Sequence, residues 1–142
     1  MPVPALTPLE TIKGSVLIVD DDGFLLDTLT QALTEEEYFV VGARDGVQAI
    51  SMLDLVEYNL ILLDLHLPRV HGTEVAKLFK ELAVSAPIVI MTGHLMGRQF
   101  AKDLGLAGCL EKPFGLEELF AVVTTHCNPV PLPFDGNLWQ TF

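Results

Sequence analysis

Hydrophobic residues along the chain alternate between short continuous runs and helically spaced stripes. Three runs, Val16–Val19, Leu60–Leu63 and Ile88–Met91, are entirely apolar, and each is bounded by a polar residue. Such runs are typical of parallel strands that are buried on both faces. Tyr38–Val41, which is aromatic and β-branched, and the short segment Cys109–Leu110 have strand character as well. The pattern therefore predicts five strands.

A helical stripe follows each predicted strand. In five segments, apolar residues recur at the spacing that places them on one face of a helix. These residues are Phe24, Leu25, Leu29, Ala32 and Leu33; Val47, Ile50 and Leu53; Val75, Leu78, Phe79 and Leu82; Phe100 and Leu104; and Leu116, Leu119, Phe120 and Val123. A strand followed by a helix, repeated five times, predicts an α/β fold: a doubly wound, five-stranded parallel sheet with helices on both faces.

Proline-rich segments flank this alternating region. We predict an extended N-terminal arm over residues 1–13, one folded domain over 14–127 and a C-terminal tail over 128–142. The tail contains aromatic side chains that could dock on the domain or on a partner, and it could equally be a linker. The residues concerned are Pro2, Pro4 and Pro8 in the arm, and Pro129, Pro131, Pro133, Phe134, Trp139 and Phe142 in the tail.

Composition narrows the class of protein. The chain has 142 residues, half of them hydrophobic, and 8 Lys+Arg against 19 Asp+Glu give a net charge of −11. This apolar content supports a core and excludes disorder, and the acidity is a poor match for nucleic acid or an anionic membrane. Cys109 and Cys127 are too few for a disulfide scaffold, so we expect buried thiols in a reducing cytoplasm.

Chemically reactive residues stand where the predicted strands end. Asp20 and Asp21 follow the first strand, Asp64 the third, Thr92 the fourth and Lys112 the fifth. Because the carboxyl ends of parallel strands share one edge of the sheet, these side chains should converge. Clustered carboxylates need a counter-charge, and Mg²⁺ prefers oxygen ligands. An aspartate flanked by a cation and a lysine can act as a nucleophile toward phosphorus.

Four motifs resemble the receiver domain of two-component response regulators. They are VLIVDDD (16–22), LILLDLHLP (60–68), MTG (91–93) and EKPF (111–114). Each alone is weak, but the four in this order, each at its own strand end, are highly specific. The resemblance covers roughly residues 14–127 and implies a flavodoxin-like, CheY-like fold.

The resemblance assigns roles to the acidic residues. Asp64 would accept a phosphoryl group from a histidine kinase or phosphotransfer protein, without acting as an enzyme on other substrates. Asp21 would bind Mg²⁺ directly and Asp20 through water, with the backbone carbonyl of His66 as a further ligand. Asp22, which precedes a helical stripe, is better explained as a helix N-cap than as a metal ligand.

The resemblance also assigns roles around the phosphoryl group. Thr92 would donate a hydrogen bond to it, and Lys112 would pair with it, with a cis Lys112–Pro113 peptide bond. His66 and His94 either line the approach to the phosphoryl group or are exposed loop residues. A zinc site formed by these two histidines is a weaker alternative.

The sequence departs from the family in its signalling region. Three residues before the motif lysine the family usually has a Tyr or Phe that reports phosphorylation, and here that residue is Cys109. Four glycines between Thr92 and Lys112 predict a fourth helix that is short or mobile. We therefore expect the chemistry to be retained and the signalling route to be altered. Receivers often pair through the fourth helix, so a homodimer is left open.

Output is expected through protein–protein contact with an unidentified target. Beyond Lys112 the only charged residues are Glu117, Glu118 and Asp135, whereas a DNA-binding module needs cationic side chains. Two alternatives stay open: a pseudo-receiver that works without phosphorylation, and a receiver fragment of a larger hybrid kinase or regulator. An aspartyl-phosphate phosphatase is less favoured, because His66 replaces the second acid that such enzymes usually carry two residues after the nucleophile.

Overall fold

A five-stranded parallel sheet forms the centre of the protein. The computed structural model describes residues 12–68, 70–82 and 84–127. The strand order is β2-β1-β3-β4-β5, and every neighbouring pair is parallel. The predicted α/β fold is therefore confirmed. The strands are β1 (Gly14–Val19), β2 (Tyr38–Ala43), β3 (Leu60–Asp64), β4 (Ile88–Thr92) and β5 (Gly108–Glu111).

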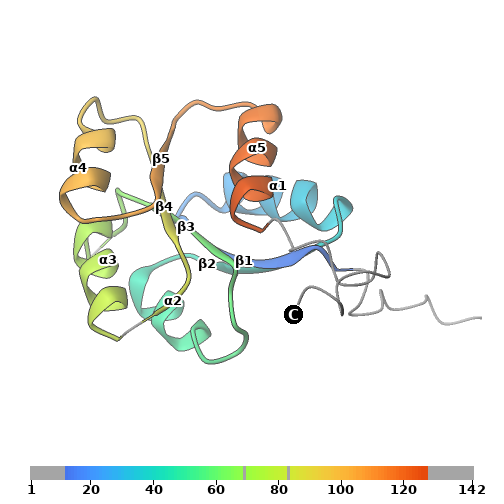
Figure 1. Ribbon diagram of the computed structural model, residues 1–142, viewed down its shortest axis with the longest axis horizontal. Coiled ribbons are helices and arrows are strands. Elements are labelled where there is room, and N and C mark those ends of the chain that lie inside the picture. The colour runs from blue at the N-terminus through green and yellow to red at the C-terminus, as the bar shows by residue number, and fades with distance from the viewer. Residues whose placement is uncertain (1–11, 69, 83, 128–142) are drawn as a thin grey trace, which may run out of the picture.

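Helices cover both faces of the sheet. Helices α1 and α5 lie on one face, and α2, α3 and α4 lie on the other (Figure 1). Three of the predicted stripes extend one residue beyond the helix. Their last residues are C-caps, namely Leu53, Leu82 and Leu104. The helices are α1 (Gly23–Glu35), α2 (Gly46–Met52), α3 (Gly72–Glu81), α4 (Gly97–Asp103) and α5 (Leu116–His126).

The core is divided between the two faces by the alternation of side chains along each strand. In β1, Val16 and Ile18 pack with α1 and α5, whereas Leu17 and Val19 pack with α2 and α3. All four side chains are completely buried. Since full burial of such a side chain contributes about 1.5–3 kcal/mol, a central strand must be apolar at every position, which is the pattern seen in the sequence.

Side-chain caps fix where the helices begin, next to the ends of the strands. Asp22 accepts a hydrogen bond from the backbone N–H of Leu25 at 3.1 Å, which confirms its predicted role as the N-cap of α1. His71 caps α3 by accepting from the N–H of Thr73 at 3.2 Å, a role for which the sequence offered no signal. Satisfying these amides typically stabilises a helix by about 1 kcal/mol.

Glycine brings α3 into direct contact with the strand that precedes it. The N–H of Gly72 donates to the carbonyl of Leu65 at 2.9 Å. A Cβ on Gly72 would overlap the backbone carbonyl oxygen of Asp64 and would lie 2.7 Å from the Cα of Leu65. Helix α3 can therefore begin where it does only because residue 72 has no side chain.

Residues 1–11 and 128–142 lie outside the described residues. The predicted arm over 1–13, the tail over 128–142 and the exact bounds of the domain over 14–127 therefore stay predictions. Among the helices of the described residues, none is long and apolar enough to cross a membrane.

Candidate functional site: an acidic cluster at the carboxyl edge of the sheet

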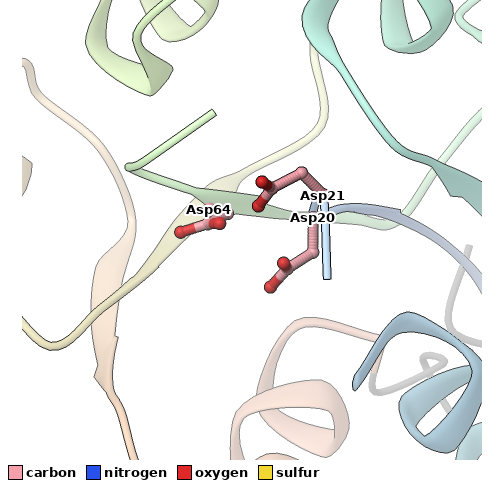
Figure 2. A group of neighbouring side chains, drawn as sticks. All are labelled: Asp20, Asp21 and Asp64. Atoms are coloured by element: carbon pink, nitrogen blue, oxygen red, sulfur yellow. The ribbon is translucent and has the colours of Figure 1, made fainter. Parts of the chain in front are cut away.

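Three carboxyl groups meet where β1 and β3 end. Asp20 and Asp21 follow β1 directly, and Asp64 is the last residue of β3. Because β1 and β3 are adjacent, with Val19 paired with Leu63, the strand ends bring one oxygen of each carboxyl group within 4.8 Å of the others (Figure 2). Asp20 and Asp64 are buried, whereas Asp21 is exposed.

Lys112 supplies the positive charge that faces this cluster. Its Nζ lies 2.8 Å from Oδ2 of Asp20 and 3.5 Å from Oδ1 of Asp64. The residue follows β5, and its backbone N–H donates to the carbonyl of Thr92 at 2.9 Å. The Lys112–Pro113 peptide bond is cis, as predicted. One ammonium group against three carboxylates leaves these four side chains with a combined charge of −2.

Backbone N–H groups orient the two buried carboxylates. The N–H of Asp22 donates to Oδ1 of Asp20 at 2.9 Å, and the N–H of His66 donates to Oδ1 of Asp64 at 3.1 Å. Asp20 therefore accepts a hydrogen bond at each oxygen, one from this amide and one from Lys112. Bonds of this kind hold a carboxylate in one orientation and stabilise its ionised form.

Burial nevertheless makes Asp64 hard to ionise. Desolvation raises the pKa of Asp64 to about 6, aided by the negative charges of Asp20 and Asp21. The hydrogen bond from His66 and the charge of Lys112 lower this pKa without cancelling the effect of burial. Burial alone would lower the pKa of Lys112, but its contacts with Asp20 and Asp64 outweigh that effect and raise it. Near neutral pH, Asp64 is therefore mainly an anion that has lost much of its hydration.

Thr92 is the buried hydroxyl at this edge. It is the last residue of β4 and follows Met91, which pairs with Asp64 in the sheet. Its Oγ1 accepts a hydrogen bond from the N–H of His94 at 2.9 Å. The bond uses a lone pair of the hydroxyl oxygen and leaves the hydroxyl proton available for donation.

Arg44 contacts the site and was missed by the sequence analysis. It lies just beyond β2, and its Nη2 donates to the backbone carbonyl of Asp21 at 3.3 Å. The preceding residue, Ala43, accepts a hydrogen bond from the N–H of Asp20 at 3.0 Å. The end of β2 therefore supports the acidic loop. A contact between a side chain and a backbone carbonyl leaves no motif in a sequence, so nothing marked Arg44 beforehand.

Three histidines lie on the loops around the cluster. The ring of His66 lies 5.7 Å from that of His71 and 6.3 Å from that of His94, between centroids. Nδ1 of His71 accepts from the N–H of Thr73, and Nδ1 of His94 accepts from the N–H of Met96 at 3.0 Å. Within the described residues, the group of His, Cys, Asp and Glu side chains close enough to share a metal ion is the acidic cluster, which contains no histidine. The structure therefore gives no support to the zinc alternative.

The cysteines differ in burial. Cys127 is only 2% exposed, in agreement with the prediction of a buried thiol, whereas Cys109 is half-buried. Cys109 packs against the apolar cluster of Leu65, Ile90 and Ala101 beneath α4. Burial is the main reason that its pKa is raised, and the negative charge of Glu111 adds to the effect.

Comparison with known families decides what kind of domain this is. The response regulator receiver domain family matches residues 16–124. The chain belongs to this family. Receiver domains work in two-component signalling and interact with histidine kinases or phosphotransfer proteins. The strand-end motifs, the fold and the acidic cluster are thus those of one recognised class of signalling domain.

Curated relatives of this receiver domain are regulators of greater length. The chain is 33% identical over 120 residues to the transcriptional regulatory protein TcrA of Mycobacterium tuberculosis, covering 83% of this chain and 47% of TcrA. It is 34% identical over 108 residues to the response regulator MprA of Mycobacterium avium, covering 75% of this chain and 47% of MprA. The chain thus spans just under half the length of these relatives.

Solved structures match the same domain. The CheY-like receiver domain protein of Methanospirillum hungatei JF-1 aligns with a TM-score of 0.75 and 27% identity over 81% of this chain and 94% of that one. The chemotaxis protein CheY4 of Vibrio cholerae aligns with a TM-score of 0.74 and 26% identity over 80% of this chain and 98% of that one. Single receiver domains therefore match nearly from end to end.

Proposed function

We propose that this receiver domain accepts a phosphoryl group on Asp64 from a histidine kinase or phosphotransfer protein. The observation that carries the proposal is the acidic cluster itself, in which Lys112 contacts both Asp20 and Asp64 at the carboxyl edge of the sheet. A buried, partly desolvated aspartate beside a fixed ammonium group is suited to attack phosphorus, because the ammonium group stabilises the charge on the transferring oxygens.

We further propose that Asp20, Asp21 and Asp64 hold Mg²⁺, with the backbone carbonyl of His66 as an additional ligand. The charge of −2 at the site and the purely oxygen donors fit a small divalent cation. The bound ion would neutralise charge on the phosphoryl oxygens. The position of the His66 carbonyl relative to such an ion stays a prediction.

Apart from the proposed Mg²⁺, the transfer step needs only groups that the site and the donor provide. A carboxylate oxygen of Asp64 attacks phosphorus while the P–N bond of the donor phosphohistidine breaks. The donor ring enters the step protonated on its other nitrogen, so the bonding pair stays on the nitrogen that leaves and the histidine ends as neutral imidazole. Lys112 shifts its contact from the Asp64 carboxylate toward the new phosphoryl group, and Thr92 donates its free hydroxyl proton to a phosphoryl oxygen.

The output is proposed to be contact with another protein. We expect it to follow an altered route, since Cys109 replaces the aromatic residue of the usual switch. The contact could be made by this chain alone or within a longer regulator, in keeping with the length of the curated relatives.

Incubation with acetyl phosphate, with and without Mg²⁺, tests the proposal. We expect intact mass spectrometry to show one added phosphoryl group in the presence of Mg²⁺ and almost none in its absence. Asp64→Asn should abolish labelling, because it removes the nucleophile, whereas Asp54→Asn, which changes an exposed carboxylate elsewhere, should leave it unchanged.

Two results would contradict the assignment. Equal labelling of Asp64→Asn and wild type would place the acceptor elsewhere. Equal labelling with Mg²⁺ and with excess EDTA would show that phosphorylation does not require the metal, and it would not affect the assignment of Asp64 as the acceptor.

A further inference from the structure

A groove opens at the amino edge of the sheet, where the strands begin, opposite the edge that carries the acidic cluster. Its volume is about 290 Å³, and none of the residues that line it is charged. They are Ile12, Gly14, Ser15, Phe39, Val56 and Asn59. The side chain of Phe39 is the largest of these and is 44% exposed, although it belongs to β2. Covering such a side chain with an apolar group is favourable, because it removes apolar surface from water.

The pleat of the sheet explains why Phe39 faces this groove. Leu17 and Val41 pack with α2 and α3. Ser15 and Phe39 stand two residues earlier on the same two strands and pair with each other across the sheet. Side chains two residues apart on a strand point to the same face, so Phe39 is turned toward the α2 and α3 face. Val56, between α2 and β3, packs with that core as well. The groove therefore continues that core to the amino edge.

Asn59 gives the groove a polar end. Its Oδ1 accepts a hydrogen bond from the backbone N–H of Ser15 at 2.8 Å. Because an N–H can only donate, this bond fixes which end of the Asn59 amide is oxygen. The amide nitrogen of this exposed side chain can then donate to a carbonyl of a segment that lies in the groove. Proline-rich segments in the polyproline II form offer such carbonyls, since that helix has no internal hydrogen bonds.

Helix α5 ends beside the groove. Cys127 is the C-cap of α5 and is buried. A Cβ on Gly14, one of the lining residues, would lie only 2.9 Å from the Cβ of Cys127. Helices α5 and α2 cover opposite faces of the sheet (Figure 1). A segment that leaves Cys127 therefore starts in contact with the wall of the groove and reaches Phe39 by crossing the amino edge.

The segment that follows Cys127 has the length and composition to make this crossing. Trp139 stands twelve residues beyond Cys127. Twelve residues in a polyproline II helix span about 37 Å, more than the separation of about 10 Å between packed layers. Residues 128–142 contain three aromatic side chains and one charged residue, Asp135, whereas residues 1–11, which adjoin the groove at Ile12, contain no aromatic residue. The C-terminal segment is thus the better match for an uncharged groove beside a phenylalanine.

We propose that residues 128–142 fold back over the amino edge and that the side chain of Trp139 fills the groove beside Phe39. A tryptophan brings 150–250 Å² of apolar surface to such a contact and packs favourably with another ring. A tethered segment has an effective concentration in the millimolar range, so a weak contact is enough to hold it. The inference does not depend on phosphorylation of Asp64, which lies at the opposite edge of the sheet.

Fluorescence of the full-length chain tests the inference, because Trp139 is the only tryptophan. Acrylamide should quench the wild-type emission weakly. Phe39→Asp places a charge in the groove and should raise the quenching constant by about twofold or more, since the indole ring returns to water. Phe24→Asp is the matched control. It changes a phenylalanine that is 83% exposed at the start of α1, near the opposite edge, and should leave the quenching constant unchanged.

Hydrogen exchange measured by mass spectrometry gives a second readout. In full-length Trp139→Ser, the amides of residues 38–41 should exchange faster than in the wild type, and those of residues 97–103 should not change. This variant alters no residue of the described core. The measurement therefore decides the question even if circular dichroism shows that Phe39→Asp fails to fold.

The other possible occupants of the groove give different results. Wild-type quenching as strong as that of free N-acetyltryptophanamide would overturn the inference and leave the groove to another protein. Equal quenching changes in both variants would place Trp139 elsewhere. Quenching that increases on dilution would indicate a contact between two copies of the chain. Protection of residues 38–41 that survives Trp139→Ser but is lost on deletion of residues 1–11 would assign the groove to the N-terminal arm. Each of these results contradicts the proposal.

Discussion

Asp64 combines two demands that conflict at the level of a single residue. Burial makes the carboxylate a better nucleophile by removing water, and the same burial destabilises the charge. The pKa of about 6 reflects this conflict, because the neighbouring N–H of His66 and Lys112 offset only part of the cost. The folded protein therefore holds Asp64 as an anion at neutral pH at the expense of stability.

Asp64→Asn should stabilise the cation-free protein in a pH-dependent way. The folded pKa lies above the ordinary value of 3.8, so ionisation of Asp64 opposes folding, and its cost grows as pH rises from about 4 through about 6. The difference in free energy of unfolding between variant and wild type should be small at pH 4 and reach about 3 kcal/mol at pH 7, because the pKa is displaced by about two units. Urea melts in EDTA at several pH values measure it. A difference that stays constant with pH would contradict the explanation.

At the scale of elements, the loops that join strands to helices carry both the caps and the chemistry. Asp22 caps α1 one residue after Asp21 of the acidic cluster, and His71 caps α3 on the loop that follows Asp64. Asp45 caps α2 by accepting from the N–H of Gln48 at 2.7 Å, and it is not one of the three carboxyl groups of the acidic cluster. At α2, therefore, a substitution can remove the helix cap without changing a residue of the acidic cluster.

Asp45→Ala should destabilise the protein without affecting phosphorylation. Loss of the capping bond leaves the N–H of Gln48 without its acceptor and should cost about 1 kcal/mol of unfolding free energy. Asp45→Asn, which keeps an accepting oxygen, is the matched control. Thermal melts and labelling by acetyl phosphate check the two halves of this expectation. Reduced labelling at full folding would show that α2 takes part in the chemistry.

The sequence predicted the elements and the acidic edge because both depend on local rules. Continuous apolar runs identified three of the five strands, and parallel topology then required Asp20, Asp64 and Lys112 to converge. The contacts of Arg44 and Gly97 could not be predicted in this way. Arg44 donates to the backbone carbonyl of Asp21, and a Cβ on Gly97, the first residue of α4, would overlap the methyl group of Thr92. Both arrangements depend on how closely one element approaches another, which residue types alone do not encode.

Across the whole molecule, charge is distributed unevenly between the two helical layers. Helices α1 and α5 carry four acidic side chains, namely those of Asp27, Glu35, Glu117 and Glu118, and no Lys or Arg. On the opposite face, α3 and α4 carry four cationic and three acidic side chains, which are Lys77, Lys80, Arg98, Lys102, Glu74, Glu81 and Asp103. The helices of the first layer therefore carry a formal charge of about −4, whereas α3 and α4 together carry about +1.

Salt should consequently stabilise the folded protein. Screening at 0.3 M NaCl reduces repulsion within a chain of net charge −11. We expect the melting temperature at pH 8 to rise by about 2–4 °C relative to 0.02 M NaCl. At pH 4.5, where many carboxyl groups are protonated, the rise should be smaller. Equal shifts at both pH values would point to a general salt effect instead of charge screening.

The close approach of α3 to β3 at Gly72 has a consequence for mutational tolerance. Gly72 has no side chain that could take part in the chemistry, yet any side chain there would displace the peptide that joins Asp64 to Leu65. In a selection for phosphorylation that samples every substitution, position 72 should therefore accept as few replacements as position 64. A map of sensitive positions would thus extend beyond the residues that meet the phosphoryl group, to the glycine that lets the acceptor strand and the next helix touch.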